Sequence, residues 1–77
     1  MAPKIQIYIE RIDSPWHQRW ITRSYGSIGT FLRYGVPKVD ATYRLEVNSI
    51  ERPYADALSA WTVKMINGRP QRIERVN

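Results

Sequence analysis

The stretch KIQIYIER at residues 4–11 decides the fold class, because apolar and polar side chains alternate along it. Isoleucine recurs at every second position, as Ile5, Ile7 and Ile9. A period of two is typical of a β-strand that buries one face and leaves the other polar. We therefore expect residues 4–11 to form a strand and Ile7, at its centre, to lie in the core.

The following segment, residues 15–25, fits two structures. As a helix it would begin after Ser14 and end at Gly26. As a strand it would pair with residues 4–11 in a hairpin. Its two faces would then carry Trp16, Trp20 and Thr22 on one side and Arg19, Ile21 and Arg23 on the other. Aromatic and β-branched residues favour pleated surfaces, so we favour the strand.

Two further elements have clearer patterns. Residues 27–34 predict a short helix, with Ser27 as the N-cap and Gly35 just beyond the end. Its apolar stripe consists of Ile28, Phe31 and Leu32. Residues 41–50 return to the alternation of a strand, with Tyr43, Leu45 and Val47 on one face.

The last third of the chain also has two interpretations. Pro53 could open an amphipathic helix that ends at Asn67-Gly68. Its stripe would be Tyr54, Ala57, Leu58, Trp61 and Met65. Alternatively, the helix stops near Ala60, residues 61–66 form a strand, and Asn67-Gly68 is a hairpin turn.

Tight pairing around that turn would place Val63 opposite Arg72, which mixes apolar and charged faces. The helix avoids this conflict, and we prefer it. In both interpretations residues 70–76 form a final strand around Ile73, with Pro70 at its start or on an edge.

These patterns together predict a small α+β protein in which residues 1–77 form a single domain. The expected architecture is a three- or four-stranded, largely antiparallel sheet with one or two helices. A chain of 77 residues has room for one core only. Its stability then depends on tight packing, a partner or self-association, so a homo-oligomer is one expected form.

The composition limits the kinds of function that we expect of this protein. With no cysteine and a single histidine, His17, the chain lacks the ligands of a typical zinc site and any disulfide. It has no phosphate-binding loop motif and no catalytic constellation, so we expect a protein that is not an enzyme and needs no cofactor or metal. No apolar stretch is long enough to span a membrane. Absence of cysteine and of a targeting segment fits a cytoplasmic location.

The charge points to an acidic partner. Twelve basic residues against seven acidic ones give a net charge of +5. Residues 14–39 contain no acidic residue but five of the nine aromatic ones. Positive charge follows a phosphate backbone, and aromatic faces stack on unpaired bases. The candidate binding residues are Arg19, Trp20, Arg23, Tyr25 and Lys38, with Arg69 and Arg72 in a second basic cluster near the C-terminus.

Three functions are compatible with these features. The first, which we favour, is binding of nucleic acid through an arginine and aromatic surface. The second is a small regulatory or inhibitor protein that docks on an acidic surface of another protein. In size and character the chain resembles the small inhibitors that phages encode, such as the anti-CRISPR proteins. The third is a structural subunit of a larger assembly.

Overall fold

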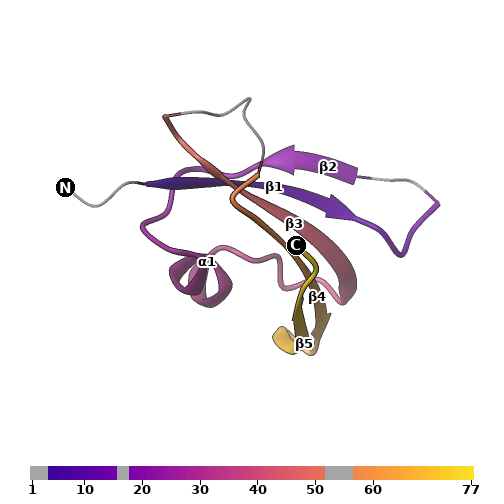
Figure 1. The fold of residues 1–77 in the computed structure, drawn as a ribbon. Helices are drawn as coiled ribbons and strands as arrows, with labels where there is room; N and C mark the ends of the chain where they lie inside the picture. Colours follow the sequence, from indigo (N-terminus) through magenta and orange to yellow (C-terminus); the bar gives the residue numbers. More distant parts are fainter. Residues whose placement is uncertain (1–3, 16–17, 52–56) are drawn as a thin grey trace.

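The computed structural model describes residues 4–15, 18–51 and 57–77 and contains five strands and one helix in that part of the chain (Figure 1). In chain order these are β1 (Ile5–Arg11), β2 (Gln18–Ile21), α1 (Ile28–Tyr34), β3 (Ala41–Ser49), β4 (Ser59–Ile66) and β5 (Arg69–Arg75). The protein is thus a small α+β fold.

The strands form one open sheet in the order β2-β1-β3-β4-β5, and every neighbouring pair is antiparallel. β1 and β2 form the expected hairpin, in which Ile9 lies opposite Trp20. The chain then passes through α1 to reach β3 on the other side of β1. From β3 onward, consecutive strands are neighbours in the sheet, which places β2 and β5 at its two edges.

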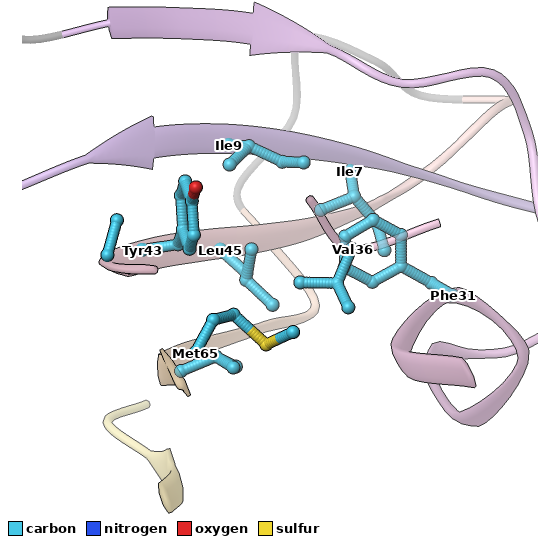
Figure 2. Close-up of a cluster of buried hydrophobic side chains, with 9 residues drawn as sticks. Ile7, Ile9, Phe31, Val36, Tyr43, Leu45 and Met65 are labelled. Atoms are coloured by element: carbon cyan, nitrogen blue, oxygen red, sulfur yellow. The ribbon is translucent and has the colours of Figure 1, made fainter. Parts of the chain in front are cut away.

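The core fills the space between the sheet and α1 (Figure 2). Ile7 and Phe31 are completely buried, and so is Leu45. Cross-strand partners such as Ile7 and Val47 point to the same side, because side chains directly opposite in a ladder share a face. This confirms the prediction that Ile7 is a core residue.

Three predicted elements are confirmed within the described residues. They are the strand at 18–21 in the ambiguous segment, the helix at 28–34 and the strand at 41–49. The helix begins as predicted, because the Ser27 hydroxyl accepts a hydrogen bond from the Thr30 backbone N–H at 3.2 Å. It ends at Gly35, whose N–H donates to the Phe31 carbonyl. Trp16, His17, Pro53 and Tyr54 lie outside the described residues.

The preferred helix in the last third is wrong, since residues 59–66 form the strand β4. Val63 and Met65 enter the core opposite Tyr43 and Ala41 of β3. The spacing of apolar residues fits both structures, and pairing with β3 stabilises the strand. This additional strand brings the sheet to five strands with one helix in the described residues, rather than the three or four strands expected.

A β-bulge removes the face conflict that tight pairing would cause. Asn67 and Gly68 have positive φ angles of 54° and 73° and form the turn between β4 and β5. Met65 pairs with Pro70, but the register then shifts, so Lys64 pairs with Arg72 and Val63 with Ile73. Gln71 is the extra residue, and its insertion returns the apolar side chains of β5 to the face of Val63.

Candidate functional site

The seven predicted binding residues do not form one surface. Arg19 and Trp20 are neighbours in β2 and therefore point to opposite faces of the sheet. Trp20, 37% exposed, packs edge-on against Tyr43 on the α1 side. Lys38 is exposed in the connection from α1 to β3, and Arg69 and Arg72 lie on β5 at the far edge. Arg23 lies over the Tyr25 ring, and Arg19 and Trp20 both line one hollow, so the structure brings the predicted residues together only in pairs.

The face of the sheet that points away from α1 carries mixed charge. Arg19 of β2 lies opposite Glu10 of β1, with 3.6 Å between the Arg19 Nε and the Glu10 Oε1. On β3, Arg44 pairs with Glu46 at 2.6 Å, and on β5 Arg72 donates to Glu74 at 2.6 Å. The charged residues of β1, β2 and β3 line a hollow of about 390 Å³ together with two residues that pack on the α1 side, Ile9 and Trp20; its full lining is Tyr8, Ile9, Glu10, Arg19, Trp20, Ile21, Arg44 and Glu46. Carboxylates therefore offset the arginines of this face.

A second surface is basic and aromatic without acidic residues. One hollow, of about 360 Å³, is lined by Lys4, Arg23, Ser24, Tyr25, Gly26, Thr30 and Tyr34. A neighbouring hollow of about 280 Å³ is lined by Ser27, Gly29, Thr30, Arg33 and Tyr34. The two hollows share Thr30 and Tyr34 and therefore adjoin each other. We call this the α1 surface and define it by Lys4, Arg23, Tyr25, Thr30, Arg33 and Tyr34.

Backbone pairing holds the β1 side of this surface in place. Ile5 and Tyr25 exchange two backbone hydrogen bonds of 2.8 Å, which brings Lys4 next to the segment that follows β2. The Tyr25 ring packs edge-on against Phe31, with 5.4 Å between ring centroids. The Arg23 guanidinium lies over the Tyr25 ring, 5.4 Å from its centroid. Tyr25 thus links the surface to the core.

α1 supplies the rest of the surface. Phe31 points into the core, whereas Thr30, Arg33 and Tyr34 of the same helix are exposed. Tyr34 is 69% exposed, and the Arg33 guanidinium lies 5.9 Å from its ring centroid. Within the described part of the chain, Lys4, Arg23 and Arg33 form no ion pair with a carboxylate. Their charges remain available to a partner.

Three residues of this surface were absent from the predicted binding set. Arg33 and Tyr34 lie in the acid-free stretch 14–39, and the helical stripe of Ile28, Phe31 and Leu32 already implied that they face outward. That signal could have found them. Lys4 has no such signal, because only the pairing of Ile5 with Tyr25 brings it to this surface.

The Arg11 side chain donates a hydrogen bond to Asp13 at 2.9 Å, which lowers the pKa of that carboxyl group. Residues 4–15, 18–51 and 57–77 contain no group of three or more His, Asp or Glu side chains that could hold a metal ion. In the same ranges, no helix has both the length and the apolar character that crossing a membrane requires.

Comparisons with protein-family models, curated proteins and solved structures gave no match to this chain.

Proposed function

We propose that the protein binds single-stranded nucleic acid through the α1 surface. The observation that carries this proposal is the arrangement of three cations and two tyrosines, with no acidic residue in the lining, around two adjoining hollows. Lys4, Arg23 and Arg33 would contact phosphates. Tyr34, the most exposed ring of the surface, would stack on an unpaired base.

The α1 surface fits this role better than the opposite face of the sheet. There Arg19, Arg44 and Arg72 each lie beside a glutamate, and these carboxylates would repel phosphate. Arg19, Trp20, Lys38, Arg69 and Arg72 stay predictions from the sequence, and the proposed site does not include them. Arg23 and Tyr25 are the part of the predicted set that the proposal retains.

The first test is a fluorescence anisotropy titration with a labelled oligonucleotide of about 12 nucleotides, single-stranded and as a duplex. We expect tighter binding to the single strand, since a duplex does not offer unpaired bases for stacking. Three phosphate contacts predict that raising salt from about 50 to about 200 mM weakens single-strand binding by about 20-fold.

Matched charge reversals locate the site. The pair Arg23→Glu and Arg33→Glu alters the α1 surface, whereas the pair Arg19→Glu and Arg69→Glu alters exposed arginines at the two sheet edges. Each pair removes four units of positive charge, from +5 to +1. We expect the first pair to lose most of its affinity and salt dependence and the second to lose much less. Equal losses would show that net charge alone attracts the oligonucleotide.

Substitutions of Tyr34 distinguish base stacking from electrostatic attraction. Tyr34→Ala should weaken single-strand binding by about 1–3 kcal/mol, the range for one base stacked on an aromatic ring. Tyr34→Phe keeps the ring and should bind almost as the wild type does. If both variants bind equally well, Tyr34 does not stack on a base.

Failure to bind any oligonucleotide at low salt would contradict the proposal. The same variants then test the second function, docking on an acidic protein surface, because charge reversal also slows association with such a partner.

A further inference from the structure

β5 forms an edge of the sheet and has a neighbouring strand on one side only among the described residues. It is the last strand in the order β2-β1-β3-β4-β5, and all seven of its residues are exposed. Ile73 at its centre is 43% exposed, and Val76 just beyond its end is 52% exposed. An edge strand of this length offers a row of backbone donors and acceptors to another strand.

The hydrogen bonds to β4 show which backbone groups of β5 point outward. The Val76 N–H donates to the Ala60 carbonyl at 2.9 Å, so the backbone N–H of Val76 points toward β4. Alternate residues of an antiparallel strand direct their backbone groups to the same neighbour. The backbone N–H and C=O groups of Glu74 and Arg72 therefore also point toward β4. Those of Ile73 and Arg75 point away from the sheet.

The sequence of β5 is complementary to itself when two copies run antiparallel about Ile73. In that register Ile73 lies opposite Ile73 of the second copy, and the two can exchange a pair of backbone hydrogen bonds. Arg72 lies opposite Glu74 of the second copy, and symmetry creates the same pair again. Regular pairing does not extend further, because Gln71 is the bulged residue of β5 and Asn77 already exchanges backbone hydrogen bonds with Ala60 of β4. No two like charges face each other.

The neighbouring symmetric registers are less favourable. Pairing centred on Arg72 places two arginines directly opposite, and pairing centred on Glu74 places two glutamates opposite. Like charges directly opposite destabilise a strand pair, whereas opposite charges and paired apolar side chains stabilise it. The charge pattern of β5 therefore selects the register centred on Ile73.

From this complementarity we propose that the protein forms a symmetric dimer in which the β5 strands of two copies pair antiparallel about Ile73. The two five-stranded sheets then become one continuous sheet, and the twofold axis closes the assembly at two copies. The pairing uses no residue of the α1 surface, so it is independent of the proposed nucleic-acid binding.

Charge reversal with cross-rescue tests the register. Sedimentation equilibrium of the wild type should show a monomer–dimer equilibrium. Arg72→Glu creates glutamate opposite glutamate, and Glu74→Arg creates arginine opposite arginine, so each variant alone should dimerise at least about tenfold more weakly. Mixing the two variants restores both complementary pairs, and a mixed dimer of about wild-type affinity should form. Circular dichroism establishes that each variant is folded.

Amide hydrogen exchange of the wild type provides a test that needs no variant. The amide of Ile73 should become protected as protein concentration rises. Those of Arg19 and Ile21, on the opposite edge strand β2, should not change. A wild type that stays monomeric at all concentrations, a mixture of the two variants that does not dimerise, or unchanged exchange at Ile73 would each overturn the proposal.

Discussion

Val63 of β4 lies directly opposite Ile73 of β5, although Met65 lies opposite Pro70 nearer the turn. Between these two pairs β4 advances by two residues and β5 by three. The additional residue, Gln71, is exposed and keeps Ile73 on the face of the fully buried Val63. One bulged residue thus makes a two-residue turn compatible with the alternation of both strands.

The bulge predicts an unusual tolerance to deletion. Removing Gln71 should leave Val63 opposite Ile73 and regularise the ladder, at a cost of less than about 1 kcal/mol. Removing Thr62 instead, at a regular position of β4, moves half of the strand to the wrong face and should unfold the protein. Thermal unfolding of both variants measures the difference. Equal destabilisation by the two deletions would contradict this role of Gln71.

Ile7 should be among the most sensitive positions. It is 0% exposed at the centre of β1, so Ile7→Ala should lower the free energy of unfolding by about 2–5 kcal/mol. Ile21→Ala is the matched control, because Ile21 is 51% exposed on the edge strand β2 and should cost much less. Urea denaturation gives both values. A small effect at Ile7 together with a large one at Ile21 would mean that the faces of the hairpin are reversed.

Alanine substitutions at two glycines of α1 and its C-cap should change the stability of the protein in opposite directions. A β-carbon at Gly35 would overlap the hydroxyl and ring of Tyr25 and approach Phe31. Gly35→Ala should therefore destabilise the protein and displace the Tyr25 ring from the α1 surface. Gly29 is the second residue of the helix, and a β-carbon there would meet the Ser27 Oγ at an ordinary contact distance of 3.8 Å, so Gly29→Ala should stabilise by about 0.5–1 kcal/mol. Melting temperatures check both; stabilisation by Gly35→Ala would show that Tyr25 moves aside freely.

Tyr43 should make the stability sensitive to alkaline pH. Burial raises the pKa of its phenol, and its hydroxyl donates to the Val39 carbonyl at 3.0 Å. Since the folded pKa lies above the unfolded value of about 10, the stabilisation is complete below that pH and is lost as the pH rises through the folded pKa. Tyr43→Phe should remove this dependence and, by losing the hydrogen bond, cost about 1 kcal/mol at neutral pH.

Unfolding free energies of the wild type and Tyr43→Phe from about pH 8 to about pH 11 test this expectation. If the unfolding free energy falls equally with pH in both proteins, groups other than Tyr43 cause the loss of stability at alkaline pH.

The sequence by itself determined the elements whose signals are local. The isoleucine alternation of residues 4–11 gave the first strand and the burial of Ile7, because a strand turns successive side chains to opposite faces. Ser27 and Gly35 gave both ends of α1, because capping depends on hydrogen bonds within a few residues. The acid-free stretch also contained Arg23, Tyr25, Arg33 and Tyr34 of the α1 surface.

Only the tertiary structure decided features that depend on distant partners. Residues 59–66 became a strand because β3 offers an edge on which Val63 and Met65 reach the core. The bulge at Gln71 depends on which face of β4 is buried, because it places Ile73 opposite Val63. Lys4 joins Arg23 only through the pairing of Ile5 with Tyr25, twenty residues along the chain. The spacing of residues along one segment specifies its faces, but the free energy of pairing with other segments decides which structure forms.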